Sequence, residues 1–143
     1  MPAAGPVPEA GLAAAIVWFD ALITNVDRTP RNTNLLRWHG RLWLIDHGAA
    51  LYFHHAGRTP GHERMRFEQI REHVLLPFAG PVGEADARLA PLVTRGLLEG
   101  IVEAIPAEWL GGDERSVYVD YLLGRLAEPR EFVEEAERAR GRR

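Results

Sequence analysis

The 143-residue chain contains neither cysteine nor lysine. The absence of cysteine excludes disulfide bonds and thiolate metal sites, and it favours the cytoplasm as the compartment. The absence of lysine excludes Schiff-base chemistry by this chain and a lysine clamp on a nucleotide phosphate. All 17 basic residues are arginines. This use of arginine, together with abundant alanine, is typical of a GC-rich bacterial genome.

Long apolar runs and an excess of one charge are also lacking. No segment approaches the roughly 20 apolar residues that a membrane-spanning helix needs, and a net charge of −3 gives no general reason to expect nucleic-acid binding. The opening MPAAGPVPEAG carries three prolines and no basic residue, which is not the pattern of a signal peptide. The sequence therefore predicts a flexible leader over residues 1–7, a basic tail over residues 139–143, and no membrane or nucleic-acid partner.

The composition is that of an ordinary globular domain, since 46% of the residues are apolar and 26% are charged. At this length one domain, residues 8–138, can bury a sizeable core. Apolar residues recur at three- and four-residue spacing over residues 8–24, 66–76, 84–105, 113–127 and from residue 129 onward, which predicts helices. The expected fold class is mainly α, a helical bundle with one small β-hairpin near its start.

The spacing also assigns inward faces to these helices. The helix over 8–24 carries an apolar stripe of Leu12, Ala15, Ile16, Phe19, Leu22 and Ile23. Val17 and Trp18 widen this stripe, so the helix is expected to be buried on most sides. The inward face of the helix over 66–76 is predicted to carry Phe67, Ile70 and Val74, and this helix is expected to end at Pro77. The helix over 84–105 presents one face of Leu89, Leu92, Val93, Leu97, Ile101 and Ile105. Asp113 is the predicted N-cap of the helix that follows.

Residues 25–48, NVDRTPRNTNLLRWHGRLWLIDHG, form a polar and turn-rich stretch that contains all three asparagines and two of the six aspartates. Residues 25–34 are predicted to be a loop, because Pro30 disfavours helical geometry at Thr29 and the polar side chains compete for backbone hydrogen bonds. Residues 35–38 and 42–45 are two β-type runs separated by residues 39–41, which predicts a tight hairpin. Gly48 is predicted to have unusual backbone dihedrals.

Several ionisable side chains in or near this stretch need an assignment. Asp20 is either an exposed helical carboxylate or a buried group that hydrogen-bonds the following loop. His47 is expected to donate a hydrogen bond in the core of the loop. The spacing of His54, His55 and His62 fits no metal motif and no thiolate is available, so an exposed histidine-rich loop is expected there.

The stretch supplies what phosphoryl transfer requires of a protein. The reaction needs a carboxylate to orient the acceptor hydroxyl, and oxygen ligands to hold Mg²⁺ against the phosphates. Asp27, in a polar loop after a helix, can serve the first purpose. Asn32 and Asp46 offer an amide oxygen and a carboxylate oxygen. The intervening hairpin folds Asp46 back beside Asn32, so that both can hold one hard cation.

The segment FDALITNVDRTPRNTNLL…LWLIDHG resembles the catalytic and metal-binding loops of HipA-like kinases, bacterial serine/threonine kinases related in fold to the phosphatidylinositol 3- and 4-kinases. The family pattern is an Asn, then an Asp, an Asn five residues after that Asp, a hairpin, and a second metal-binding Asp. Asn25, Asp27, Asn32 and Asp46 match this order. The resemblance implies the C-terminal lobe of a protein-kinase-like fold that uses ATP and Mg²⁺.

The resemblance also implies roles for individual residues. Asp27 would be the catalytic base, and Asn32 and Asp46 would be the Mg²⁺ ligands at the ATP site. Arg28 follows the Asp directly, as in the lipid-kinase relatives, and would orient either the loop or a phosphate. Asn25 would brace the loop.

The nucleotide site implied by the resemblance is only half represented in this sequence. Leu35 or Leu36 would form the floor under the adenine. Kinases of this family also carry an N-terminal lobe with a nucleotide-gripping loop and a phosphate-binding lysine. The few residues before the loop and the absence of lysine predict that this N-lobe is missing from the chain and could be supplied by a separate chain.

The resulting functional hypothesis is an ATP-dependent phosphotransferase that acts on a protein serine or threonine, or on a small molecule, once an N-lobe completes it. A second hypothesis is a non-catalytic helical binding module derived from a kinase, such as an inactive pseudokinase fragment. A third is a plain helical domain with a chance motif, which predicts that Asp27 and Asp46 lie far apart.

Overall fold

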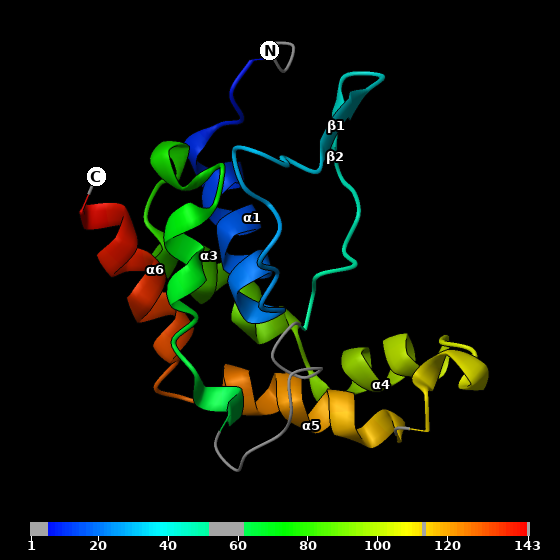
Figure 1. Cartoon of the computed structure of the whole chain (residues 1–143). Coiled ribbons are helices and arrows are strands. Elements are labelled where there is room, and N and C mark those ends of the chain that lie inside the picture. The colour runs from blue at the N-terminus through cyan, green and yellow to red at the C-terminus, as the bar shows by residue number, and fades with distance from the viewer. Residues whose placement is uncertain (1–5, 52–61, 113, 143) are drawn as a thin grey trace.

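The structure is a computed structural model that describes residues 6–51, 62–112 and 114–142. Within these residues the chain forms five α-helices, several short 3₁₀ turns and one antiparallel pair of strands (Figure 1). The fold is therefore mainly helical with one small hairpin, as the sequence predicts. None of the helices in the described part is long and apolar enough to cross a membrane.

Helix α1 (Ala10–Leu22) lies at the centre of the main hydrophobic core. It packs against α3 (Val82–Leu89) and α6 (Glu131–Gly141), and against two 3₁₀ turns, η2 (Glu68–Glu72) and η3 (Leu76–Phe78). In Figure 1 these elements gather around the blue α1 helix. The first helix is thus confirmed, and it forms the platform from which the polar loop departs.

The buried face of α1 agrees in part with the prediction, since Ile16, Val17, Trp18 and Leu22 are buried as expected. Leu12 and Phe19 are exposed to 48% and 36%, whereas the side that faces α3 and α6 is rich in alanine. The buried residues of the helix are Ala13, Ala14, Ile16, Val17, Trp18, Asp20, Ala21 and Leu22. Small side chains let neighbouring helices approach closely, so the alanines decide which face is inside.

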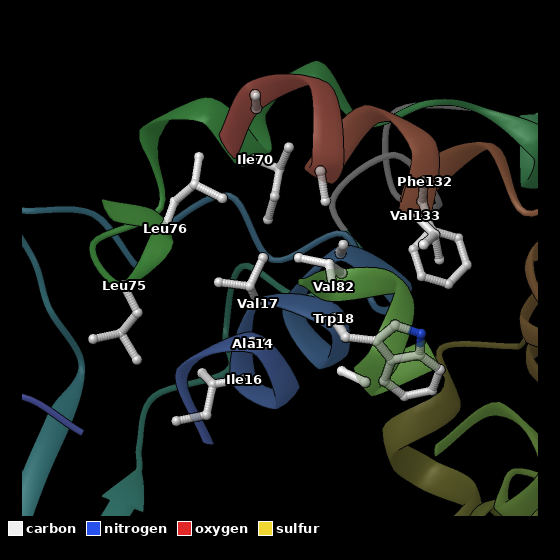
Figure 2. Packing of buried hydrophobic residues seen from close by; sticks show 14 of the residues in the cluster. Ala14, Ile16, Val17, Trp18, Ile70, Leu75, Leu76, Val82, Phe132 and Val133 are labelled. Atoms are coloured by element: carbon white, nitrogen blue, oxygen red, sulfur yellow. The ribbon is translucent and has the colours of Figure 1, made fainter. Parts of the chain in front are cut away.

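Trp18 links three elements of the main core (Figure 2). Its ring lies 6.1 Å from the ring of Phe132 in α6, at an interplanar angle of 58°. Its indole Nε1 donates a 2.8 Å hydrogen bond to Asp86 of α3. Arg130, which precedes α6, donates to both oxygens of the same carboxylate at 2.9 and 3.0 Å. Packing and a polar clamp therefore hold α1, α3 and α6 together.

The single helix predicted over residues 84–105 is wrong. The chain forms α3, a 3₁₀ turn over Ala90–Leu92, and a separate helix α4 (Arg95–Glu103). Pro91 lacks a backbone N–H and cannot continue the helix. The Thr94 hydroxyl then accepts the Leu97 N–H at 3.2 Å and begins α4 as its N-cap.

This break changes which residues of the segment face inward. Leu92, Leu97 and Ile101, predicted to be inside, are exposed to 63%, 47% and 53%. Leu98 and Val102 are buried instead, and they pack against Val119 of α5 (Arg115–Leu126) in a second small cluster. Figure 1 shows α4 and α5 extending together to one side of the main bundle.

The helix predicted over residues 66–76 is also wrong in type. The segment consists of the 3₁₀ turns η2 and η3, with Phe67 left-handed at φ 61° and His73 extended between them. Phe67 and Ile70 are buried as predicted. Pro77 lies in the first turn of η3 and does not end a helix. His73 leaves helical geometry where its side chain turns towards Asp20.

The hairpin consists of β1 (Leu35–Trp38) and β2 (Arg41–Leu44), in the register Leu36 opposite Trp43 and Trp38 opposite Arg41. The turn has two residues, His39 and Gly40, with φ of 48° and 74°, the geometry that matches strand twist in tight hairpins. The second strand therefore begins one residue earlier than predicted.

The two faces of the hairpin have different environments. Leu35, Leu42 and Leu44 point towards the main core and are partly buried against it. The opposite face exposes four large apolar side chains, at 42–60% of their area. We call this surface the exposed hairpin face, and its residues are Leu36, Trp38, Trp43 and Ile45.

Two further sequence predictions concern the ends of the last helices. Helix α6 continues to Gly141 and buries Ala139, so the described part of the predicted tail is helical. Helix α5 has Glu114 as its N-cap residue, and Asp113 lies outside the described residues.

We expect Leu76→Ala to lower the free energy of unfolding by about 2–5 kcal/mol, because Leu76 is fully buried and its removal leaves a cavity in the main core. The matched control is Leu92→Ala, which removes the same atoms from an exposed side chain. This control should change the free energy of unfolding by about 0.5 kcal/mol or less. Urea unfolding of both variants measures the difference. Equal losses in the two variants would contradict the described core.

Candidate functional site

The polar loop leaves α1 through a strained residue. Thr24 follows the helix with φ 50° and is fully buried. Positive φ is rare for a β-branched residue and costs of order 1–3 kcal/mol. No described residue hydrogen-bonds its hydroxyl. Asn25 then donates its N–H to the Asp20 carbonyl at 2.9 Å, and the loop begins. The sequence contained no signal for this strain.

A buried carboxylate organises the base of the loop. Asp20 is fully buried and accepts hydrogen bonds from Arg28 Nε at 2.5 Å, Arg28 Nη2 at 3.2 Å and Asn25 Nδ2 at 3.2 Å. His73 Nε2 lies 2.7 Å from the same carboxylate. Of the two interpretations of Asp20, the structure therefore confirms the buried group that bonds the following loop.

The His73 ring is fixed on both of its nitrogens. Nδ1 accepts the Leu75 N–H at 3.0 Å, so Nε2 carries the proton that is donated to Asp20. Burial by itself raises the pKa of Asp20. The hydrogen bonds from His73 and Arg28, together with the electrostatic attraction of the same two groups, outweigh this effect, so the pKa of the Asp20 carboxyl lies below its ordinary value of 3.8. The site therefore contains a permanently ionised carboxylate at neutral pH.

Arg28 joins the loop to the end of the hairpin. Its side chain is fully buried, and Nη1 donates to the Asn34 carbonyl at 2.5 Å and to the Ile45 carbonyl at 3.4 Å. The Ile45 N–H in turn donates to the Asn34 carbonyl at 3.0 Å. Of the two roles that the resemblance left open for Arg28, this burial fits orientation of the loop.

His47 lies beside this junction. Arg28 Nη2 is 3.1 Å from His47 Nε2, and because arginine can only donate, the imidazole nitrogen accepts. The ring also makes an edge contact with Phe19, with centroids 6.1 Å apart. His47 is exposed, so the prediction of a donor within the core of the loop is wrong.

Asp27 is held by two side-chain amides through a single oxygen. Its Oδ2 accepts from Asn32 Nδ2 at 2.8 Å and from Asn34 Nδ2 at 3.3 Å. Its backbone N–H donates to Asn25 Oδ1 at 3.2 Å, so Asn25 braces the loop as the resemblance implies. No described residue donates a hydrogen bond to the second carboxylate oxygen, Oδ1. The half-buried carboxylate is thus oriented with one oxygen available.

Asn32 is placed by a tight turn. Its backbone exchanges hydrogen bonds with Thr29 at 3.1 and 3.0 Å, and its side chain is exposed. Because Nδ2 is engaged by Asp27, the amide oxygen Oδ1 faces no described donor and remains available. An oriented amide oxygen is a suitable ligand for a hard cation.

Asp46 follows the hairpin in an unusual conformation. It has φ 52° and is exposed, and its Oδ1 accepts the Gly48 N–H at 3.3 Å. The unusual dihedral that was predicted for Gly48 therefore belongs to Asp46, because aspartate tolerates the left-handed region better than most residues. Asp46 directly follows Ile45, whose N–H is hydrogen-bonded to the Asn34 carbonyl, and the Asn34 side chain is hydrogen-bonded to Asp27. Two hydrogen bonds through Asn34 thus connect the segments that carry the two aspartates.

The exposed hairpin face adjoins this polar cluster. Leu36 is 46% exposed, whereas Leu35 packs against the main core. Of the two residues that the resemblance proposed as an adenine floor, Leu36 is therefore the accessible one. Among the described residues, no group of three or more His, Cys, Asp or Glu gathers as a metal site. His54, His55 and the side chain of His62 lie outside these residues.

A separate cavity of about 570 Å³ lies between η2 and α6. Its lining is almost entirely charged and consists of Arg66, Glu68, Arg71, Glu72, Glu135, Arg138, Ala139 and Arg142. None of these residues belongs to the loop or to the hairpin. The volume suits a small ligand, but the chemistry described above lies elsewhere, on an open surface.

Sequence reasoning missed the supports that come from distant parts of the chain. His73 lies 53 positions after its partner Asp20, and nothing in its neighbourhood marks it as functional. Comparison with protein-family models, curated proteins and solved structures found no match to this chain. The function is therefore inferred from the residues and their geometry.

We expect Asp20→Asn to reduce the pH dependence of stability in acid. Because the pKa of Asp20 is lower in the folded state, its contribution is complete above the unfolded-state pKa and is lost as the pH falls through the lowered folded-state pKa. Urea unfolding from about pH 5 down to about pH 2.5 should show a steeper loss in the wild type than in Asp20→Asn.

The exposed Asp120 provides a matched control for this experiment. Asp120→Asn removes the same charge from a side chain with 65% exposure and should leave the pH profile close to that of the wild type. Parallel profiles for the wild type and Asp20→Asn would show that Asp20 does not have the lowered pKa.

Proposed function

We propose that this chain is the catalytic C-terminal lobe of an ATP-dependent phosphotransferase of the HipA-like kind. The observation that carries the proposal is the oriented carboxylate of Asp27, which is bonded through one oxygen to Asn32 and Asn34. The order Asp27, Asn32, hairpin, Asp46 supports the same assignment. A chance motif in a plain helical domain would not require the Asn32 and Asn34 amides to be hydrogen-bonded to Asp27.

Asp27 would act on the acceptor hydroxyl. The available Oδ1 accepts the hydrogen bond of a hydroxyl group and orients its oxygen towards the γ-phosphorus of ATP. As the new O–P bond forms and the bond to ADP breaks, the hydroxyl proton passes to Asp27. The two amides on Oδ2 hold the carboxylate in place, so that the substrate meets an oxygen of fixed direction.

Asn32 and Asp46 would hold Mg²⁺. An amide oxygen and a carboxylate are hard ligands that suit this ion, which keeps several waters and takes further oxygens from the phosphates. The residues present therefore fit the ion. When bound, Mg²⁺ would neutralise charge on the phosphates of ATP, while Asn32 also keeps Asp27 in its orientation.

A second lobe would complete the nucleotide site. The exposed hairpin face provides an apolar platform beside Asp46, with Leu36 as the candidate adenine floor. Exposed apolar surfaces of this kind mark binding sites. A β-rich lobe with an arginine or lysine for the phosphates, supplied by another chain or segment, would cover the platform and close the ATP between the two lobes. The acceptor would be a protein serine or threonine, or a small molecule.

The alternative is a non-catalytic binding module derived from a kinase. The exposed hairpin face favours it, because the face can bind a partner without any reaction. The two functions differ in their dependence on Asp27. Binding of a partner lobe through the hairpin does not need the Asp27 carboxylate, whereas phosphoryl transfer does.

We expect Asp27→Asn to lower phosphoryl transfer by about 10²–10⁴-fold, because the amide cannot accept the hydroxyl proton. The measurement is transfer of the γ-phosphate of labelled ATP to protein in the presence of Mg²⁺ and a β-rich partner lobe. Asp120→Asn, the matched control on the exposed side of α5, should keep the wild-type rate. Equal turnover by Asp27→Asn would remove Asp27 from the catalytic role.

We expect Asp46→Asn to weaken Mg²⁺-dependent ATP binding by roughly tenfold or more, since a charged ligand becomes neutral. Asparagine is the suitable replacement because it tolerates the φ of 52° at this position, so backbone strain is not added. Calorimetric titration of the chain with ATP, with and without Mg²⁺, measures the change. If Asp46→Asn binds with wild-type affinity, Asp46 is not a ligand.

A further inference from the structure

Arg125 of α5 is a buried arginine surrounded by backbone carbonyls. Its side chain is among the largest that are fully buried, and the residue is 2% exposed. Nε donates to the Leu22 carbonyl at 2.7 Å and Nη2 to the Ala21 carbonyl at 2.6 Å. Nη1 donates to the carbonyls of Glu63 and Met65, both at 3.1 Å. One guanidinium therefore joins α5 to the end of α1 and to residues 63–65.

The last carbonyls of α1 need such a partner. A helix leaves its final carbonyls without intrahelical donors, and buried ones must be satisfied from elsewhere. The Phe19 and Asp20 carbonyls accept from Ile23 and Asn25. The carbonyls of Leu22 and Ala21 accept from Arg125, and the Ala21 carbonyl also accepts from the Thr24 N–H at 3.4 Å. Arg125 thus caps α1 from outside its own segment.

The positive charge suits this position. No hydrogen bond or ion pair joins Arg125 to a carboxylate among the described residues. Burial lowers the pKa of the guanidinium to about 10, with Tyr121 acting in the opposite direction, so the group is still charged at neutral pH. The negative end of the α1 dipole stabilises a cation here. The guanidinium also lies over the Phe132 ring, 5.0 Å from its centroid.

The end of α1 that Arg125 caps anchors both arms of the candidate site. The Asp27 loop starts there, with the Asn25 N–H on the Asp20 carbonyl. The segment that carries Asp46 returns to the same place, where the Leu51 N–H donates to the Ile23 carbonyl at 2.6 Å. The direction in which the chain leaves α1 therefore sets the position of Asp27 relative to Asp46.

We propose that Arg125 is a positioning residue for the Asp27 loop, which it holds through the Ala21 and Leu22 carbonyls. The proposal rests on the proposed function of Asp27. Arg125 does not touch the reacting atoms. Because Arg125 belongs to α5 and binds the end of α1, the position of α5 helps to fix the start of the loop. The α4–α5 pair therefore supports the site indirectly.

Gly124 provides independent support for this coupling. A Cβ atom at this position would clash with Cγ and Cβ of Glu63. Glycine inside a helix costs about 1 kcal/mol relative to alanine, so its presence in the last turns of α5 needs a reason. The close approach to Glu63 supplies one, because it brings the Glu63 and Met65 carbonyls within reach of Arg125.

The test compares amide hydrogen exchange in Arg125→Gln with that in Arg115→Gln. Arg115 is a matched control from the same helix, since it donates to the Val102 and Ile105 carbonyls at the end of α4, at 3.0 and 2.6 Å. We expect Arg125→Gln to speed exchange in peptides covering residues 19–34 by about tenfold or more relative to Arg115→Gln. Arg115→Gln should act mainly on residues 100–106.

Two further variants keep the test decisive if Arg125→Gln does not fold. Arg125→Lys keeps the charge but not the planar fork and should give an intermediate increase over the same peptides. Gly124→Ala keeps the guanidinium but pushes against the Glu63 side chain, whose carbonyl Arg125 binds, and should also speed exchange there although alanine favours the helix. Exchange over residues 19–34 that is unchanged in every folded variant would overturn the proposal.

The outcome is independent of catalysis. If Asp27→Asn retains full phosphoryl transfer, the proposed function fails, while the exchange data still show whether Arg125 holds the loop. If the function holds, Arg125→Lys should lower kcat and leave KM nearly unchanged, because the loop geometry is disturbed and no contact with ATP is removed. A change in KM alone would contradict a positioning role.

Discussion

The buried Asp20 carboxylate is the constraint on which the rest of the site depends. It gathers Asn25 and Arg28 of the loop and His73 of a distant segment into one hydrogen-bonded group. Taking ions out of water costs several kcal/mol each, and such a group is stable only when its hydrogen bonds are nearly complete. Here both carboxylate oxygens are satisfied, and Arg28 is left with donors for the Asn34 and Ile45 carbonyls. The loop geometry follows from this arrangement.

The absence of lysine acquires a structural meaning in this light. Backbone carbonyls at loops and helix ends must be hydrogen-bonded when they are buried. Arg28, Arg115 and Arg125 perform this task at three different places in the fold. A guanidinium presents five donors in a fixed plane, whereas a lysine ammonium is a point charge. The arginines therefore act as internal connectors between elements, in addition to solubilising the surface.

The sequence predicted those features that depend on neighbouring residues. Helix α1, the polar loop and the hairpin were predicted because apolar periodicity and turn residues are local signals. The single helix over residues 84–105 was wrong because the pattern was followed through Pro91, whose missing N–H outweighs periodicity. The inward face of α1 was misjudged at Leu12 and Phe19, because alanines line the close helix contacts.

Within the candidate site, the sequence indicated the residues of the motif but not the distant residues that hold them in place. Asp27, Asn32 and Asp46 could be singled out by order and spacing. His73 and Arg125 could not, because their partners lie far away in the sequence. The positive φ at Asp46 was assigned to Gly48, since glycine is the usual residue for that conformation.

The hairpin has one more consequence, which concerns the behaviour of the chain in solution. Within the described residues the sheet has two strands and both are edges, so each presents backbone donors and acceptors with no partner in this part of the chain, beside exposed tryptophans. Such edges are templates for pairing between molecules and for aggregation. The brevity of the strands and the charges of Arg37 and Arg41 oppose this pairing. The surface that the proposed function assigns to a partner is thus also prone to self-assembly when it is uncovered.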